Sequence, residues 1–353
     1  RSVPISKKRF QRINKDRVMV SAFGYKARNI FKHIKRVQIV ACGTSYNAGM
    51  VAKYWLEDIS KIPCNVEVAS EYRYRNPVIL NDTLFVVISQ SGETADTLAA
   101  LKNAKKINDT INTLCICNSA ESSITRASDL TFLTHAGPEI GVASTKAFTT
   151  QLVSLALLTC SIGVIKKTIS KEREKSIVDG LKLLPGIIYE CLSEEIHIKR
   201  IAKRFKDKKS ALFIGRGTMH AIAAEGALKL KEISYIHAEA FPAGELKHGP
   251  IALIDNNMPV IAVAPNDELL SKLKSNLQEV KSRGSQMIVF EDKDSKVKSM
   301  SAMEVISITS NLGRITAPII FTIPLQLLSY HIALIKGTDV DKPRNLAKSV
   351  TVE

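Results

Sequence analysis

The sequence lacks the cysteine spacings that hold a metal or cross-link a small fold. No C-x-x-C pair occurs in it. Structural zinc sites usually need such pairs, and a disulfide framework needs several cysteines crowded into a short chain. The six cysteines are Cys42, Cys64, Cys115, Cys117, Cys160 and Cys191. We therefore expect reduced thiols, as in a cytoplasmic protein, and neither a metal nor another cofactor.

Acidic residues are almost absent from the start of the chain. Residues 1–36 hold twelve Lys or Arg and a single acid, Asp16, and so carry most of the formal net charge of +16. A basic arm can bind nucleic acid, but this one lacks an interleaved aromatic platform and is too short for most helix-turn-helix domains. We expect no nucleic-acid partner. A solvated basic face is the other interpretation of the arm.

Uninterrupted apolar runs of membrane-spanning length are also lacking. The apolar stretch Leu152–Ile165 is short, and Ile315–Ile335 is interrupted by Pro318, Pro324 and several polar residues. Both stretches predict buried helices, and we expect no membrane partner. The chain opens without a signal peptide and with Arg1 rather than methionine, so we expect a fragment or a processed product.

What the sequence does contain is a regular alternation of strands and helices. With 353 residues, 45% of them hydrophobic, the chain is long enough for about two globular domains. In the first half, short β-branched strands alternate with helices at Ala48–Glu57 and Ala95–Lys105, which favours a parallel sheet covered on both faces. The predicted strands are Val37–Ala41, Val66–Val68, Leu84–Ser89, Thr113–Cys117 and Leu130–Leu133.

The second half repeats this pattern. Gly43 and Gly215 follow similar strands 172 positions apart, and each half closes with a long apolar helix that carries a glutamine, Gln151 or Gln326. Strand candidates of the second half lie at Leu212–Gly217, Val260–Ala264 and Met287–Phe290. A tandem duplication explains the repetition. We predict a basic leading segment (1–27), a first domain (28–168), a helical connector (169–200), a second domain (201–344) and a C-terminal tail (345–353).

A run of hydroxyl residues follows the predicted strand Leu84–Ser89. Exposed backbone N–H groups and the positive end of the next helix favour an anion at such a turn, and hydroxyls can bond to its oxygens. No lysine closes the loop as in a nucleotide P-loop, so the run fits a sugar phosphate better than a triphosphate. An ordinary capped turn would use the same residue types. The run is Ser89-Gln90-Ser91-Gly92-Glu93-Thr94.

A second run of this kind, Cys42-Gly43-Thr44-Ser45, follows the strand Val37–Ala41. The corresponding loop of the second half, Pro265-Asn266-Asp267-Glu268, lacks the hydroxyl cluster, so we expect one sugar-phosphate site per chain. The segment 137–146 supplies further small residues, among them Val142 and Ser144, that would let a ligand approach closely. A helix cap is the alternative interpretation of that segment.

Candidate catalytic residues stand in the second half and at the end of the chain. Glu225, Lys229 and Glu232 fall at i, i+4 and i+7 of a predicted helix and share one face. A salt-bridged surface stripe has the same spacing and is the simpler interpretation of the helix taken alone. His248 lies between glycines and a proline, and histidine readily carries protons near neutral pH. Lys348, on a tail that is otherwise solvated, could form a Schiff base with a ketose carbonyl if the tail folds back.

Taken together, four motifs resemble the glucosamine-6-phosphate synthase family, the bacterial-type glutamine:fructose-6-phosphate aminotransferases, from about residue 25 to Glu353. The motifs are Cys42-Gly43-Thr44-Ser45, the hydroxyl loop 89–94, the helix 225–232 and the terminal Pro343-Arg344-Asn345-Leu346-Ala347-Lys348. The resemblance implies a homodimer and an α/β fold of two tandem sugar isomerase (SIS) domains. Each would be a flavodoxin-like three-layer α/β/α sandwich with a five-stranded parallel sheet.

The resemblance also implies a role for each candidate residue. The phosphate would be held by Ser45, Ser89, Gln90, Ser91 and Thr94. The sugar would be lined by Cys42, Gly43, Thr44, Val142, Ser144 and Ala347. Lys348 would form a fructosimine and Glu232 would move a proton between C1 and C2. Glu225 and Lys229 would orient the sugar hydroxyls, and His248 of the neighbouring subunit would open the ring.

Members of this family normally begin with a glutaminase domain whose first residue is a nucleophilic cysteine, and the sequence has no such segment before Arg1. We therefore expect the isomerase half alone, with fructose 6-phosphate as substrate and glucosamine 6-phosphate or glucose 6-phosphate as product. Without ammonia from a glutaminase, the resemblance implies slow isomerisation of fructose 6-phosphate to glucose 6-phosphate.

Two other functions are compatible with parts of the pattern. Relatives with two SIS domains include fructosamine-6-phosphate deglycases and amino-sugar-phosphate deaminases. The terminal Ala347-Lys348 and the Lys247-His248-Gly249 segment favour the synthase over these. A sugar-phosphate-sensing regulator usually has a single SIS domain joined to a DNA-binding domain, and it would not need the duplication, Glu232 or Lys348.

Overall fold

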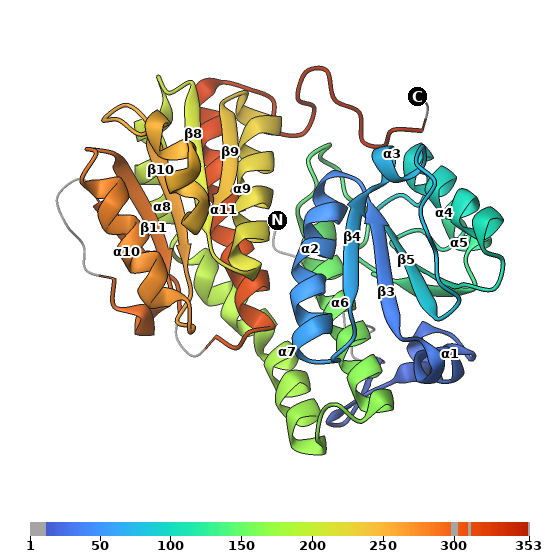
Figure 1. Ribbon diagram of the computed structural model, residues 1–353. Coiled ribbons are helices and arrows are strands. Elements are labelled where there is room, and N and C mark those ends of the chain that lie inside the picture. The colour runs from blue at the N-terminus through green and yellow to red at the C-terminus, as the bar shows by residue number, and fades with distance from the viewer. Residues whose placement is uncertain (1–11, 298–302, 310–311, 352–353) are drawn as a thin grey trace. The chain divides into compact units, whose positions relative to one another are not determined.

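The computed structural model describes residues 12–297, 303–309 and 312–351, so the first eleven residues of the predicted basic segment lie outside the described residues. The chain forms two compact units (Figure 1). Unit 1 consists of Arg1–Ile140, Ser144–Lys182 and Ala347–Glu353, and unit 2 of Gly141–Ala143 and Leu183–Leu346. The domain boundaries given above stay a prediction.

The core of unit 1 is a fully parallel sheet with strand order β4-β3-β5-β6-β7. The central strand β5 is rich in β-branched and aromatic residues, and all seven of its residues are buried because helices cover both faces of the sheet. The strands are β3 (Arg36–Ala41), β4 (Cys64–Val68), β5 (Thr83–Ser89), β6 (Asn112–Cys117) and β7 (Leu130–Leu133).

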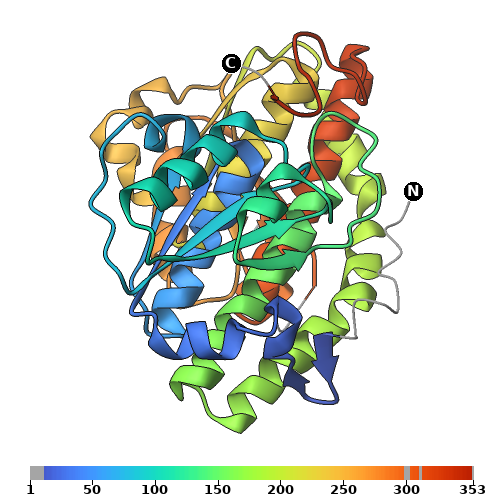
Figure 2. The ribbon, with the colours of Figure 1, turned by 90° about the vertical axis from the view of Figure 1, so that its right-hand side faces the viewer.

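Helices cover this sheet in two layers. One layer pairs α2 with α6, and α1 also packs on α6, whereas α3, α4 and α5 pack together in the other layer (Figures 1 and 2). Apolar side chains of α4 fill the space above alternate residues of β3, β5 and β6, as the two-residue period of a strand requires. The helices are α1 (Ala27–His33), α2 (Gly43–Asp58), α3 (Ala69–Tyr72), α4 (Ala95–Ile107), α5 (Ser123–Ala127) and α6 (Lys146–Lys166).

The described part of the basic arm is folded onto unit 1. It forms an antiparallel ribbon of β1 (Ile13–Asn14) and β2 (Arg17–Val18), followed by the 3-10 turn η2 (Val20–Phe23). Phe23 at the end of that turn is 1% exposed, and its ring stacks on Phe132 of β7 with the centroids 4.3 Å apart. This part of the arm therefore contributes to the hydrophobic core.

Unit 2 repeats the architecture around a second fully parallel sheet, with strand order β12-β11-β10-β8-β9. Its strands are β8 (Ser210–Gly215), β9 (His237–Pro242), β10 (Pro259–Ala264), β11 (Gln286–Glu291) and β12 (Met303–Ser307). Its helices are α8 (Glu195–Ala202), α9 (Thr218–Ser234), α10 (Leu270–Lys281) and α11 (Thr316–Lys336), and α7 (Lys171–Leu192) leads into it. Two five-stranded parallel sheets with helical layers confirm the predicted fold class.

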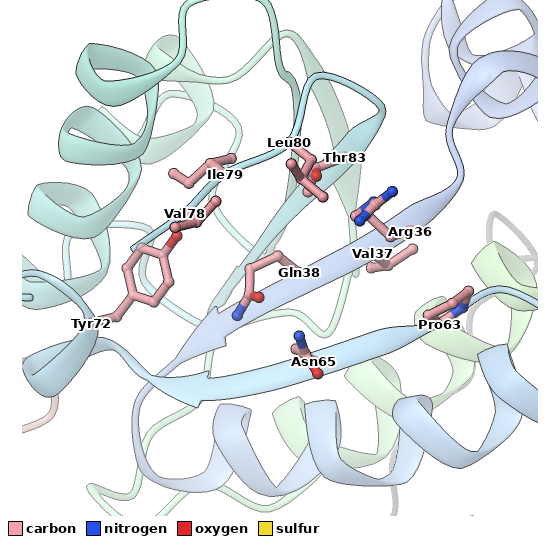
Figure 3. A pocket seen from close by; sticks show the side chains of 10 residues that line it. All are labelled: Arg36, Val37, Gln38, Pro63, Asn65, Tyr72, Val78, Ile79, Leu80 and Thr83. Atoms are coloured by element: carbon pink, nitrogen blue, oxygen red, sulfur yellow. The ribbon is translucent and has the colours of Figure 1, made fainter. Parts of the chain in front are cut away.

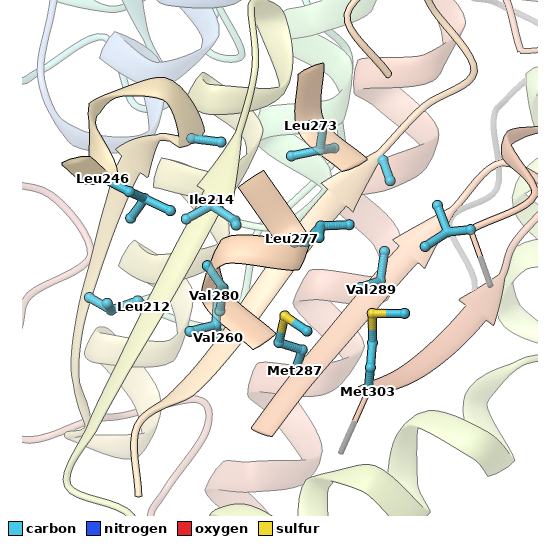
Figure 4. Close-up of a cluster of buried hydrophobic side chains, with 14 of the residues drawn as sticks. Leu212, Ile214, Leu246, Val260, Leu273, Leu277, Val280, Met287, Val289 and Met303 are labelled. Atoms are coloured by element: carbon cyan, nitrogen blue, oxygen red, sulfur yellow. The ribbon is translucent and has the colours of Figure 1, made fainter. Parts of the chain in front are cut away.

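The two faces of the second sheet are filled by different helices. Leu273, Leu277 and Val280 of α10 pack on alternate residues of β8, β10 and β11, as Figure 4 shows. The 3-10 turn η4 (Ala243–His248) contributes Ala243 and Leu246 to the same cluster. Helix α9 packs against α11, and both helices belong to the other layer (Figure 1).

Helices α6 and α11 are long and apolar enough to cross a membrane by length and composition alone. In α6, 83% of the most apolar window is buried inside the structure, and in α11 the share is 67%. Such burial is typical of core helices, so the two predicted buried helices are confirmed.

One predicted element began too late. The helix expected at Ala48–Glu57 starts at Gly43, directly after Cys42, which has extended backbone angles. Thr44 and Ser45 therefore lie in the first helical turn rather than in a loop. The sequence pattern was misleading because glycine and short hydroxyl residues occur both in turns and in the first turn of a helix.

Candidate active site

Two hydroxyl-bearing segments meet the carboxyl ends of neighbouring strands in unit 1. The chain runs from β3 through α2 to β4 on one side, and from β5 through α4 to β6 on the other. Strands β3 and β5 are adjacent, so the direction of the connections reverses between them. Ligands of open α/β sheets bind in the crevice that such a reversal opens. Ser45 and Ser89 therefore stand at the position where this fold class binds ligands.

The loop after β5, residues 89–94, is held by its own hydroxyls. Ser89 Oγ lies 2.9 Å from Thr94 Oγ1 and accepts the backbone N–H of Gly92 at 3.0 Å. Ser91 Oγ accepts the backbone N–H of Glu93 at 3.1 Å. The loop opens onto the N-terminus of α4, whose positive end favours an anion.

Gly92 is required in this loop for two reasons. Its φ of +71° lies in the left-handed region, which side chains other than glycine rarely adopt. A Cβ atom there would also lie 2.0 Å from Ser122 Oγ and 2.7 Å from Cys117 Sγ. The backbone of the loop is therefore pressed directly against the segment that follows β6.

Glu93 ties the loop to α5. Its Oε1 accepts the backbone N–H of Ser123 at 2.8 Å, and this bond holds the pKa of Glu93 below its ordinary value, with a small contribution from Arg126. The backbone N–H of Ile124 donates to the Gly92 carbonyl at 3.1 Å. The one carboxylate of the loop is therefore bonded to the start of another helix.

The first turn of α2 provides the second hydroxyl group. Ser45 is buried, and its Oγ accepts a hydrogen bond from Nε2 of Gln151 on α6 at 2.9 Å. Cys42 lies just before the helix, with its Sγ 3.9 Å from Thr97 Oγ1. Burial raises the pKa of the Cys42 thiol, so this cysteine is a neutral thiol rather than a thiolate nucleophile.

The C-terminal tail of unit 1 lies at the N-terminus of α4. The backbone N–H of Ala95, the first residue of that helix, donates to the carbonyl of Val350 at 3.0 Å. Lys348 stands two positions earlier and is half-buried. The tail therefore passes beside the hydroxyl loop, as the Schiff-base interpretation of Lys348 requires.

In unit 2, Glu225, Lys229 and Glu232 of α9 form a buried charge cluster. The Nζ of Lys229 lies 3.4 Å from Glu225 Oε1 and 2.6 Å from Glu232 Oε2. Side-chain exposure is 1% for Glu225 and 2% for Lys229, but 21% for Glu232. These values exclude a solvated surface stripe and leave Glu232 as the carboxylate of the cluster that solvent reaches.

The two neighbouring carboxylates keep the Lys229 amine of this cluster charged. Burial alone would lower the pKa of Lys229, but Glu225 and Glu232 together outweigh that effect and raise it. The lysine is therefore a permanent cation between two carboxylates. Such a cation holds both carboxylates in place.

The other candidate residues are placed as follows. His248 is exposed and ends the 3-10 turn η4 of unit 2, next to Gly249 with a φ of +133°. Val142 belongs to unit 2, where its backbone N–H donates to the Asp341 carbonyl at 2.9 Å, and Ser144 belongs to unit 1. Gly43, Thr44, Gln90, Ala347 and Lys348 are all in unit 1.

The loop of unit 2 that corresponds to the hydroxyl loop has a different chemistry. Asp267 accepts the backbone N–H of Leu269 at 2.9 Å, and burial raises the pKa of this carboxyl. A carboxylate at this position disfavours an anion. In the described residues no group of three or more His, Cys, Asp or Glu side chains could hold a metal ion.

Unit 1 also has a cavity of about 330 Å³ at another place (Figure 3). It is lined by β3, β4 and the connection that leads to β5, including Gln38, Asn65, Tyr72 and Val78. None of the candidate residues lines this cavity.

One contact of the site was not predicted from the sequence. Gln151 stands out there only as a glutamine that both halves share, and its bond to Ser45 is visible only in the structure. A lone amide in an apolar helix is the signal that could have found it.

Comparison with known proteins agrees with this arrangement. Residues 30–161 and 204–336 each match the SIS domain. The glutamine–fructose-6-phosphate aminotransferase (isomerizing) of Pseudomonas putida is 60% identical over 342 residues, which are 97% of this chain and 56% of that protein. The chain thus spans about half the length of the curated relatives it matches.

Solved structures give the same result. The C-terminal domain of glucosamine-fructose-6-phosphate aminotransferase from Francisella tularensis superposes with a TM-score of 0.91 at 52% identity, covering 94% of this chain and 92% of that one. The glucosamine-6-phosphate deaminase of Thermotoga maritima reaches a TM-score of 0.72 at 25% identity, with coverage of 96% and 97%. The lower similarity of the deaminase does not favour the deglycase or deaminase alternative.

Proposed function

The chain belongs to the SIS domain family as two SIS domains in tandem, the isomerase half of the glutamine–fructose-6-phosphate aminotransferases, and from this we propose its reaction. The substrate is fructose 6-phosphate. The Lys348 amine condenses with the C2 carbonyl and releases water, and ammonia from a glutaminase domain then displaces the lysine amine to give fructosimine. A proton then moves from C1 to C2, and the product is glucosamine 6-phosphate. In the absence of ammonia, the same proton shift slowly converts fructose 6-phosphate to glucose 6-phosphate.

The phosphate group binds at the hydroxyl-bearing segments that follow strands β3 and β5 of unit 1. A dianion with no proton to donate needs hydrogen-bond donors, and the two helix N-termini and the hydroxyls supply them without a cation. The residues that hold the phosphate are Ser45, Ser89, Gln90, Ser91 and Thr94. The residues that line the sugar are Cys42, Gly43, Thr44, Val142, Ser144 and Ala347.

The proton transfer is carried by Glu232. Moving a proton between adjacent carbons needs a carboxylate that is ionised, partly open to solvent and fixed in orientation. Glu232 has this exposure and is held by the Lys229 amine at 2.6 Å. Glu225 and Lys229 orient the sugar hydroxyls. Lys348 forms the Schiff base at C2 and His248 opens the sugar ring.

The assembly and location follow from the same proposal. The protein is a cytoplasmic homodimer in which His248 reaches the sugar of the neighbouring subunit. It has no nucleic-acid or membrane partner and needs no metal or cofactor, because the substrate's own carbonyl and the side chains named above supply the chemistry. Its glutaminase partner domain provides ammonia.

The observation that carries this proposal is the buried Glu225–Lys229–Glu232 cluster together with the hydroxyl loop 89–94. The test is to measure conversion of fructose 6-phosphate to glucose 6-phosphate by the purified chain, with Lys348→Ala prepared in parallel to expose contaminating host isomerase. We expect conversion that disappears in the variant. Equal conversion by both proteins, or none by either, would refute the assignment.

A further inference from the structure

Gln151 connects two helices of unit 1 at the proposed phosphate site. It stands near the start of α6, is 1% exposed, and donates its amide N–H to the Ser45 hydroxyl on α2 at 2.9 Å. Ser45 is 8% exposed, so this is a buried bond between residues 106 positions apart. The roles assigned above do not use Gln151.

The direction of this bond determines where the Ser45 proton points. A serine hydroxyl has one proton to donate and two lone pairs to accept with. Because Oγ accepts the Gln151 N–H, its own proton must be directed to another acceptor. The backbone N–H of Ser45 is already bonded to the Cys42 carbonyl at 3.1 Å, so the hydroxyl is the donor that remains for a ligand.

The surroundings show which ligand that proton suits. Ser45 lies in the first turn of α2, where the backbone and the helix dipole favour an anion. A phosphate dianion accepts hydrogen bonds and donates none. With its oxygen accepting from Gln151, the Ser45 hydroxyl still has its proton to donate to such an anion.

Packing alone does not explain why a glutamine occupies position 151. Its Oε1 is buried and has no hydrogen-bond partner within the described residues. Leaving an amide oxygen unpaired costs free energy, and an apolar side chain of the same length would avoid that cost. The bond to Ser45 is the feature of Gln151 that such a side chain would lose.

We propose that Gln151 is a positioning residue that turns the Ser45 hydroxyl proton toward the phosphate of the bound sugar. The proposal rests on the function proposed above, since it takes Ser45 as a phosphate ligand. It assigns to α6 a part in substrate recognition, because the bond fixes the hydroxyl across the contact between α2 and α6.

Two substitutions at this position separate hydroxyl orientation from simple packing. Gln151→Met keeps the shape and removes the donor, so we expect the KM for fructose 6-phosphate and the dissociation constant of glucose 6-phosphate to rise about tenfold, with kcat changed by less than about twofold. In its ionised form, Gln151→Glu presents only acceptor oxygens, takes the Ser45 proton for itself and adds a negative charge. We expect it to weaken binding more than the methionine variant does. If the methionine variant binds glucose 6-phosphate as tightly as the parent, the Ser45 hydroxyl does not need the Gln151 donor and the proposal is wrong.

A double-mutant cycle with Ser45→Ala separates the coupling between Gln151 and Ser45 from any general effect of either substitution on the fold. Gln151→Met should add little to the loss already caused by Ser45→Ala, because no hydroxyl is left to orient. If Ser45→Ala weakens binding and Gln151→Met adds its full effect, Gln151 acts by another route and this proposal fails alone. If Ser45→Ala has no effect on glucose 6-phosphate binding, the proposed phosphate site fails together with it.

Thr150→Val is the matched control on the same helix. Thr150 is buried and donates its hydroxyl to the Ala147 carbonyl at 3.0 Å. The substitution therefore removes a buried side-chain hydrogen bond one position away. We expect a lower melting temperature with an unchanged dissociation constant for glucose 6-phosphate. A binding loss equal to that of Gln151→Met would show that any lost bond in α6 is sufficient, which would overturn the proposal.

Discussion

The amine of Lys229 lies 2.6 Å from Oε2 of Glu232, three positions further along α9. The lysine is almost fully buried, whereas the glutamate is partly open to solvent. A buried cation thus holds the carboxylate to which proton transfer is assigned. The stability of the protein and the proposed proton transfer both depend on this ion pair, and substitutions can separate the two effects.

Glu232→Gln should remove proton transfer and leave sugar-phosphate binding largely intact. The amide has the same shape but cannot accept the proton from C1, so we expect isomerisation to fall about a hundredfold or more. The measurement is kcat for fructose 6-phosphate beside the dissociation constant of glucose 6-phosphate. A variant that isomerises at the parent rate would show that another group is the base.

Lys229→Met should destabilise the protein strongly. It leaves the buried Glu225 and the adjacent Glu232 without their cation, and breaking a buried ion pair on one side costs about 3–5 kcal/mol. Urea titration gives the free energy of unfolding. The double variant Glu225→Gln with Lys229→Met removes one of the two stranded charges and should recover part of the loss. Equal stability of the two variants would mean that the charge of Glu225 is not the cause.

Much of the fold could be predicted from the sequence because its strands are buried and β-branched. All five strands of the first sheet were located, and so were β8, β10 and β11 of the second. The two strands that were not found, β9 (His237–Pro242) and β12 (Met303–Ser307), are edge strands with mixed polar composition. An edge strand is covered less completely, so it lacks the apolar run that identifies a central strand.

The candidate site was predictable only as a set of residues. Helical spacing placed Glu225, Lys229 and Glu232 on one face, but their burial depends on the packing of α9 against α11, about a hundred positions away. No local pattern distinguishes a buried charged stripe from a solvated one. The bond from Gln151 to Ser45 and the contact of the tail with Ala95 are likewise non-local.

Gly92→Ala should damage both the stability and the phosphate loop. The residue has a φ of +71°, and the new Cβ would lie 2.0 Å from Ser122 Oγ, so the loop or the segment behind it must move. Gly337→Ala is a control with the same φ of +71° but nothing within 4 Å of the new Cβ, so it should lose only about 1 kcal/mol of stability.

The two glycine variants are compared by urea titration and by glucose 6-phosphate binding. We expect Gly92→Ala to lose more stability than Gly337→Ala and, unlike the control, to weaken binding. Equal losses of stability and unchanged binding in both variants would mean that backbone strain alone matters and that the contact with Ser122 is relieved at no cost.

Glu93 should give the protein a stabilising bond that acid removes. Its bond to the Ser123 N–H holds its folded pKa below the ordinary value of 4.5. A carboxyl with a depressed folded pKa contributes stability that is present above the unfolded pKa and lost as the pH falls through the folded pKa.

Glu93→Gln keeps a weaker, uncharged acceptor at every pH. The melting temperature of the parent should therefore exceed that of the variant at pH 6–7, and the difference should shrink below about pH 4.5 as Glu93 becomes protonated. Comparing the two proteins at each pH cancels the titration of the other carboxylates. A difference that stays constant from pH 7 to pH 3 would show that the charge of Glu93 does not anchor the loop to α5.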